Sequence, residues 1–234
     1  MYFQKFPLTL YSLDNRQTVQ VIQNLLLRLV ISDEIKGNFS VYDEYDIKDG
    51  ETPEILAFQF YGDSNFHWLI LHMNDIIDPR FDWPLDTYNF KRFVDGKYYS
   101  SDAIHHYENS EGETISANVI LLSSSQFNFV SVGDVLVNNT YPGVGYVTEV
   151  NSTSNVRVRV TSGGITSGSQ VYLASNTNLN ANVTSTVVLS GIPVTNYNYE
   201  DEINESKRRI KILKSQFVER IVKDFDSKLS QINE

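Results

Sequence analysis

The chain has 234 residues, a formal net charge of −10 at pH 7 and no cysteine. The charge argues against nucleic acid as the main partner, because binding to a phosphate backbone relies on a basic surface. The lack of cysteine excludes disulfides, thiolate nucleophiles and cysteine-ligated zinc. No apolar run approaches the ~20 residues that a membrane-spanning helix needs, so we expect no membrane role.

The first element expected is an amphipathic helix from Asn15 to Ile31. Its apolar residues recur at helical spacing and are Val21, Ile22, Leu25, Leu26 and Leu29. Asp14 stands at the expected N-cap position. Because such a stripe needs cover, we expect Leu25 and Leu29 to lie in a protein interface. The helix belongs to an N-terminal helical arm over residues 1–44.

The next stretch, Tyr45 to Pro79, predicts the order strand, helix, short connection, helix and turn. Gly50 supplies the turn after the strand. Thr52 is an expected N-cap, and Pro53 then occupies the first helical position, where its missing N–H costs nothing. Gly62 is expected to end the first helix.

Residues 112–194 are predicted to form an inserted, small all-β domain, either a barrel or a sandwich. Between residues 115 and 195 the charged residues are Asp134, Glu149, Arg157 and Arg159, whereas the flanks are densely charged. The segments VGDVLVNN, GYVTEVNS, NVRVRVTSGG and SQVYLASN alternate apolar and polar residues. Richness in Ser, Thr and Asn could also indicate a flexible linker, but the regular valines favour an ordered β unit.

Residues 195–234 are predicted to form one long C-terminal helix that packs back on the first domain or on partners. Its apolar stripe provides the candidate interface residues Ile210, Phe217, Ile221 and Phe225. A basic band is formed by Lys207, Arg208 and Arg209. This band is either a solvated helix face or a docking surface for an acidic neighbour.

The stretch from Tyr45 to Pro79 resembles a LysM module. The matching residues are Tyr45, Ile47, Gly50, Glu51, Thr52, Leu56, Ala57, Tyr61, Gly62, Asn74, Ile76, Asp78 and Pro79. In saccharide-binding members the N-acetylglucosamine groove lies between two turns, and the resemblance assigns it to Gly50, Glu51, Thr52, Asn74 and Ile76. Those residues would contact a partner or, alternatively, a glycan. A LysM module closes with a second strand soon after the Asp-Pro pair, whereas this chain continues with a helical stretch, so we assign residues 45–111 to a LysM-like block.

A wider resemblance covers nearly all of residues 1–110 and 192–234. The runs GETPEILAFQFYGDSNFHWLILHMNDIIDPRFDWPL, HHYENSEGE and PVTNYNYEDEINESKRRIKILK are similar to the LysM-containing baseplate wedge subunit of contractile-tailed, T-even-type bacteriophages. This resemblance implies a structural protein of the virion tail baseplate, assembled in the host bacterial cytoplasm. It would hold neighbouring wedge subunits together near the tail tube and sheath, in six copies per baseplate. Its partners would be other wedge proteins, with tail sheath or tube proteins as further candidates.

No catalytic residue, metal site or cofactor is predicted, and the chain is not expected to be an enzyme. The HExxH motif is absent, and His67 and His72 do not share a helical face. We expect the adjacent His105 and His106 to point to opposite sides of a strand or loop. The main alternative function is a peptidoglycan-binding LysM adaptor. A weaker alternative is glycan binding by the inserted β domain.

Overall fold

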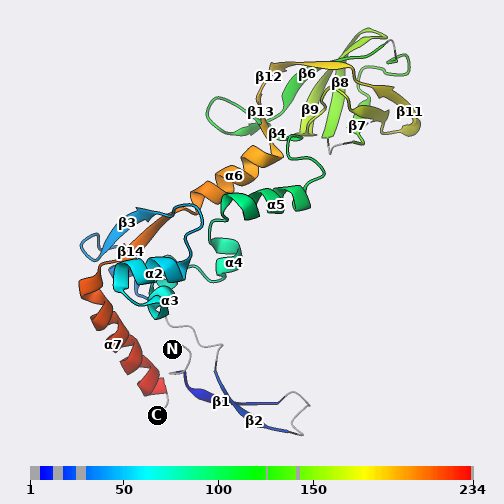
Figure 1. The fold of residues 1–234 in the computed structure, drawn as a ribbon. Helices are drawn as coiled ribbons and strands as arrows, with labels where there is room; N and C mark the ends of the chain where they lie inside the picture. The colour runs from blue at the N-terminus through cyan, green and yellow to red at the C-terminus, as the bar shows by residue number, and fades with distance from the viewer. Residues whose placement is uncertain (1–5, 13–17, 25–29, 125, 141–142, 233–234) are drawn as a thin grey trace. The chain divides into compact units, whose positions relative to one another are not determined.

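Helices and sheets both build this chain, which confirms the predicted α+β class. The computed structural model describes residues 6–12, 18–24, 30–124, 126–140 and 143–232. The chain divides into two compact units, one made of residues 1–87 with 204–234 and the other of residues 88–203. Figure 1 shows the elements of each unit along the chain.

The first unit is built from two short antiparallel sheets and several helices. Its elements are β1 (Leu8–Tyr11), β2 (Gln20–Gln23), α1 (Asp33–Lys36), β3 (Tyr42–Asp46), α2 (Pro53–Tyr61), the 3-10 helix η2 (Ser64–Phe66), α3 (His67–Met73), α4 (Pro79–Asp82), β14 (Arg209–Leu213) and α7 (Ser215–Ile232). Strand β1 pairs with β2, and β3 pairs with β14. In space, therefore, β3, α2, α3 and β14 form a strand–helix–helix–strand unit whose last strand comes from far along the chain.

The start and end of α2 follow the predicted signals. Gly50 adopts a φ of 77° in the preceding turn, a conformation that glycine tolerates without strain. The Thr52 hydroxyl accepts a long hydrogen bond of 3.4 Å from the backbone N–H of Ile55, and Pro53 is the first helical residue. Gly62 ends the helix with a φ of 77°. These local predictions are confirmed.

The core of the first unit consists of two clusters that share α3 and β14. Helix α7 packs its apolar face into one of them. The buried members of this cluster are Phe6, Ile31, Tyr42, Trp68, Leu69, Met73, Leu213, Val218, Ile221, Phe225 and Leu229. The other cluster consists of Ile47, Leu56, Ala57, Ile70, Trp83, Ile210 and Ile212. Each large side chain buried in this way contributes roughly 1.5–3 kcal/mol as an upper estimate.

Two predictions about the termini are wrong. The expected helix from Asn15 to Ile31 is a strand at residues 20–23, where β2 pairs with β1. The β-branched Val21 and Ile22 favour strand geometry when a pairing partner is near. The expected single C-terminal helix is interrupted by β14, so residues 195–234 form α6, β14 and α7. Asp14, Leu25, Leu26 and Leu29 lie outside the described residues.

The second unit contains the remaining elements. They are α5 (Thr87–Lys97), β4 (Ile104–Glu108), β5 (Thr114–Ile115), β6 (Ala117–Leu122), β7 (Val135–Asn138), β8 (Gly143–Ser152), β9 (Asn155–Gly163), β10 (Gln170–Leu173), β11 (Asn176–Asn182), β12 (Ser185–Ser190), β13 (Ile192–Thr195) and α6 (Asn196–Ser206). The boundaries between the units fall inside two helices. Helix α5 begins at Thr87, which still belongs to the first unit, and residues 204–206 at the end of α6 also belong to the first unit. A three-stranded sheet has the order β13-β4-β5.

A seven-stranded antiparallel sheet forms the main body of the second unit, with the order β11-β10-β7-β8-β9-β6-β12. The strands predicted from the alternating segments are present as β7, β8, β9 and β10. Val156, Val158 and Val160 are buried, as their alternation predicts. Only Val183 and Thr184 separate β11 from β12, the two edge strands. This continuous segment pairs first with β10 and then with β6, so it connects the two edges of the sheet.

Candidate functional site

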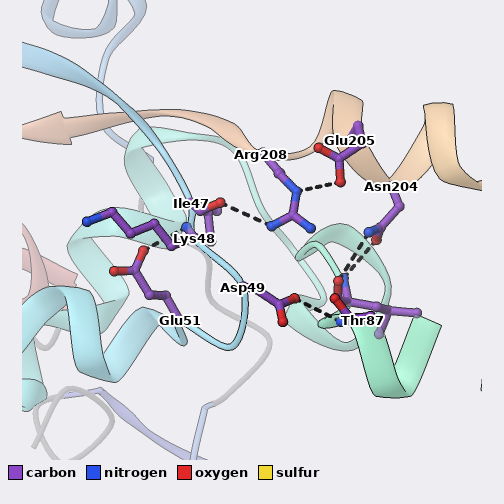
Figure 2. Close-up of polar contacts among 9 residues, drawn as sticks. Ile47, Lys48, Asp49, Glu51, Thr87, Asn204, Glu205 and Arg208 are labelled. Atoms are coloured by element: carbon purple, nitrogen blue, oxygen red, sulfur yellow. Dashed lines mark hydrogen bonds and ion pairs between the residues drawn. The ribbon is translucent and has the colours of Figure 1, made fainter. Parts of the chain in front are cut away.

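The turn before α2 is held by the chain's own groups. The Glu51 carboxylate accepts hydrogen bonds from the Lys48 backbone N–H at 2.8 Å and from the Tyr45 hydroxyl at 2.9 Å. Figure 2 shows the contact between Lys48 and Glu51. Burial raises the pKa of the Tyr45 phenol, and the hydrogen bond and charge of Glu51 add to this effect. The carboxylate that was a candidate for ligand contact therefore fixes its own turn.

The segment that follows α4 also bonds to this turn. The indole Nε1 of Trp83 donates to the Glu51 carbonyl at 2.8 Å, and the indole is buried in the core. The Thr87 backbone N–H donates to the Asp49 carboxylate at 2.8 Å, as Figure 2 shows. Gly50, Glu51 and their neighbours are thus in contact with residues 83–87 of the same chain.

Asn74 connects the end of α3 to strand β14. Its Oδ1 accepts from the Lys211 backbone N–H at 2.7 Å, and its Nδ2 donates to the Lys211 carbonyl at 2.8 Å. Nδ2 also donates to the Ile70 carbonyl at 2.8 Å. The side-chain amide therefore pairs with the outer edge of β14 as a strand residue would. Ile76 packs partly buried against the same core cluster.

The residues of the predicted basic band are bound within the first unit. Lys207 Nζ donates to the Phe81 carbonyl at 2.8 Å. Arg208 contacts the Glu205 carboxylate at 2.6 Å and the Ile47 carbonyl at 3.1 Å, as seen in Figure 2.

Arg209 pairs across the β3–β14 ladder. Its guanidinium contacts the Asp46 carboxylate at 2.9 Å and also pairs with Glu44. These contacts stabilise the return of β14 to β3, and a role of the band in docking an acidic neighbour stays a prediction.

The predicted apolar interface residues are largely covered by the chain itself. Ile210, Ile221 and Phe225 are buried in the core of the first unit, and Phe217 packs partly buried against it. The rings of Phe225 and Trp68 are 4.8 Å apart. The described part of the chain therefore covers Ile210 on β14 and Ile221 and Phe225 on α7, and contact of these positions with partners stays a prediction. Leu25 and Leu29 lie outside the described residues.

Comparison with known proteins adds the identity of the family. Residues 16–152 of the chain match a family of phage proteins described as Base plate wedge protein 53. The match spans more than half of the chain and runs from β2 to the end of β8. The chain belongs to the Base plate wedge protein 53 family. No curated protein sequence matches the chain.

This membership makes the chain a structural component of the baseplate of a phage tail, where it interacts with other baseplate components. Within the described residues, no group of three or more His, Cys, Asp or Glu side chains is arranged to hold a metal ion. No helix in the described part of the chain is long and apolar enough to cross a membrane.

One exposed surface of this wedge protein was missed by the sequence reasoning. Helix α2 buries Leu56 and Ala57, yet Ile55 is 50% exposed and Phe58 is 66% exposed on its other side. The missed signal is the sequence PEILAFQFY itself, because it is apolar around most of the helix and not along one stripe. A helix of this kind is normally covered on more than one side.

The second unit holds a cluster of ionisable side chains at α5, α6 and β4. The Glu200 carboxylate is buried and accepts from Lys97 Nζ at 2.7 Å and from the Tyr98 hydroxyl at 2.5 Å. Burial acts to raise the pKa of Glu200, but the hydrogen bonds from Lys97 and Tyr98 outweigh it, so the pKa is lowered. These contacts fix α5 against α6.

The two adjacent histidines belong to the same cluster. Nδ1 of His105 lies 2.8 Å from Nδ1 of His106, so the prediction that the rings point to opposite sides is wrong. The irregular pairing of β4 with β13 at this end of the strand accounts for the departure from strict alternation. His106 Nε2 lies 2.7 Å from the Glu108 carboxylate, and His105 stacks on Tyr199 at 3.9 Å.

Proposed function

We propose that this wedge protein holds neighbouring wedge subunits together near the tail tube and sheath of a contractile, T-even-type phage tail. The observation that carries the proposal is the apolar outer side of α2. Ile55 and Phe58 stand exposed on a helix whose other side is fixed in the core. Large apolar side chains exposed side by side on a helix are typical of a permanent protein contact, which is completed when the neighbouring subunit covers them.

We infer further that the first unit is a LysM-like block and that the second unit carries an all-β domain inserted into it. Strand β3, helices α2 and α3, and strand β14 keep the order strand–helix–helix–strand. In this interpretation β14 supplies the closing strand that does not follow Pro79 in the sequence. In this proposal the inserted domain corresponds to residues 112–194. Residues 1–44 precede the LysM-like block in the sequence, and residues 195–234 follow the inserted domain.

The partners in this proposal are other wedge proteins, with tail sheath or tube proteins as further candidates. We also propose that each baseplate contains six copies of the chain and that assembly takes place in the host bacterial cytoplasm. Glycan binding is the less favoured alternative, because Glu51 and Asn74 already bond to the chain's own backbone. A pull-down with insoluble peptidoglycan separates the two functions: we expect no retention, and retention that depends on Asn74 would favour the adaptor.

The test of the scaffold function compares two variants of α2. Phe58→Glu places a charge in the apolar patch, and Gln59→Glu places the same charge on the adjacent exposed residue. We expect baseplates supplied with Phe58→Glu to fail to assemble and those supplied with Gln59→Glu to assemble normally. Tryptophan fluorescence of each purified variant checks that the first unit is folded. Normal assembly with a folded Phe58→Glu variant would overturn the proposal.

A further inference from the structure

The hairpin formed by β1 and β2 pairs with no third strand in the described part of the chain. Phe6, before β1, and Ile31, after β2, are both buried in the core of the first unit. The hairpin is therefore anchored at both ends of its segment, while its strands are exposed. A two-stranded hairpin of this kind is at best marginally stable in water by itself.

One face of the hairpin is apolar and uncovered. Leu10 lies directly opposite Val21 in the pairing register, so both side chains lie on the same face. Leu10 is 71% exposed and Val21 is 63% exposed. Leu8 and Val19 have the same alternation and are also exposed. This face resembles the inner face of a sheet from which a neighbour is missing.

The backbone of β2 offers an open edge for a further strand. The Asn24 N–H donates to the Pro7 carbonyl at 2.7 Å, which makes these two residues a hydrogen-bonded pair. Hydrogen-bonded and non-hydrogen-bonded pairs alternate along an antiparallel ladder. Val21 and Gln23 therefore belong to non-hydrogen-bonded pairs, and their backbone N–H and C=O groups point away from β1. The corresponding outward groups of β1 are those of Leu8 and Leu10, because Pro7 belongs to a hydrogen-bonded pair and faces β2.

Charge identifies the chemistry of the strand that fits this edge. Residues 6–12 and 18–24 contain no charged side chain, although the whole chain has a net charge of −10. Exposed edge strands usually carry Lys or Pro residues that prevent pairing, and β2 has neither. A strand with charged residues beside Val21 would make no apolar cross-strand contact with it, whereas an apolar residue there would. The complementary strand is therefore uncharged on that side.

We propose that β2 pairs with an uncharged edge strand of a sheet in a different protein of the baseplate, so that the hairpin joins the two subunits by strand addition. The proposal rests on the proposed scaffold function. The neighbour satisfies the outward N–H and C=O groups of Val21 and Gln23, and its alternate apolar side chains lie beside Val21 on the same face.

The test removes one outward N–H without removing a hairpin hydrogen bond. Val21→Pro removes the donor on the β2 edge, Leu10→Pro removes the equivalent donor on the opposite β1 edge, and Val21→Thr keeps the N–H with a similar side chain. We expect Val21→Pro to be incorporated into baseplates about tenfold less well than wild type in competition, the effect of one lost hydrogen bond. Leu10→Pro and Val21→Thr should be incorporated within about twofold of wild type.

Hydrogen exchange of wild-type protein supplies an independent readout. The amides of residues 18–24 should exchange about tenfold more slowly in the assembled baseplate than in the purified chain. Equal incorporation of Val21→Pro, unchanged exchange on assembly, or slow exchange in a self-associated purified chain would each overturn the proposal. Failure of the wild-type chain to enter baseplates at all would instead overturn the scaffold function.

Discussion

Asn74→Ala tests the contact that holds β14 in the first unit. The substitution removes the acceptor for the Lys211 N–H and the donor for the Lys211 and Ile70 carbonyls. The Lys211 N–H and C=O face away from β3, because the neighbouring pairs of the ladder, such as Val41 with Lys214, are the hydrogen-bonded ones. Asn74 is therefore their partner on the outer edge.

The magnitude follows from three lost hydrogen bonds at a half-buried site. Each contributes about 1 kcal/mol net, and groups left without a partner cost more where water cannot reach them. We expect the free energy of unfolding of the first unit to fall by about 2–3 kcal/mol. In urea this corresponds to a midpoint lowered by about 1–2 M.

Intrinsic tryptophan fluorescence is the appropriate assay, because the chain's two tryptophans, Trp68 and Trp83, both lie in the first unit. Urea titrations of Asn74→Ala should be compared with Asn65→Ala, which removes an exposed amide bonded only to Asp63. The control should change the free energy of unfolding by less than about 0.5 kcal/mol. If Asn74→Ala unfolds at the same urea concentration as the control, the account of how β14 is held is refuted.

Three further predictions concern the cores and the histidine pair. Phe225→Ala should lower the stability of the first unit in the isolated chain by about 3–5 kcal/mol by urea titration, and an unchanged value would mean that partners bury this ring. Gly164→Ala should destabilise the second unit by about 1–3 kcal/mol, because the new Cβ would lie 2.4 Å from Cβ of Ile104. At Gly96 in α5 a new Cβ has no atom within 4 Å, so Gly96→Ala should stabilise the second unit by up to about 1 kcal/mol. Hydrogen exchange measures both stabilities, and equal effects of the two substitutions would contradict the prediction. Burial of the His105 ring, and next the charge of His106, lower the pKa of His105 below its ordinary 6.5. The neutral ring is therefore favoured in the folded state, and its contribution to the stability of the second unit is complete above about pH 6.5. That contribution should be lost as the pH falls through the folded-state pKa. His105→Gln should flatten this pH dependence of hydrogen exchange, and an unchanged slope would refute the assignment.

The parts predicted well from the sequence are those determined by local geometry. Thr52, Pro53 and Gly62 specify the two ends of α2 through backbone preferences that need no distant partner. The alternation of Val156 and Val158 with arginine specifies one buried face in β9. In both cases a few adjacent residues contain all the information that the structure uses.

The errors arose where two periodicities fit the same residues. Ile210 and Leu213 fit a helical stripe that continues to Phe217, but Ile210 and Ile212 also alternate with Arg209 and Lys211 as a strand. The strand is chosen because β3 offers a complementary edge, with Asp46 opposite Arg209. The same ambiguity between helix and strand applies to β2, which forms a strand because β1 pairs with it. In both cases the partner strand cannot be identified from the sequence of the ambiguous segment itself.

The distant origin of β14 also explains how a wedge protein can carry a large second unit within its first one. Loop closure costs free energy only in proportion to the logarithm of loop length, so a long insertion between α3 and β14 adds little once it folds by itself. After the insertion, the segment before β14 must be positioned correctly in the first unit. The Asn204 side chain contributes to this by accepting a hydrogen bond from the Leu85 N–H at 2.7 Å and donating one to the Leu85 carbonyl at 3.1 Å. Arg208 continues the attachment at the Ile47 carbonyl, immediately before β14 pairs with β3. The polar residues around the return of the chain therefore serve to rejoin the first unit.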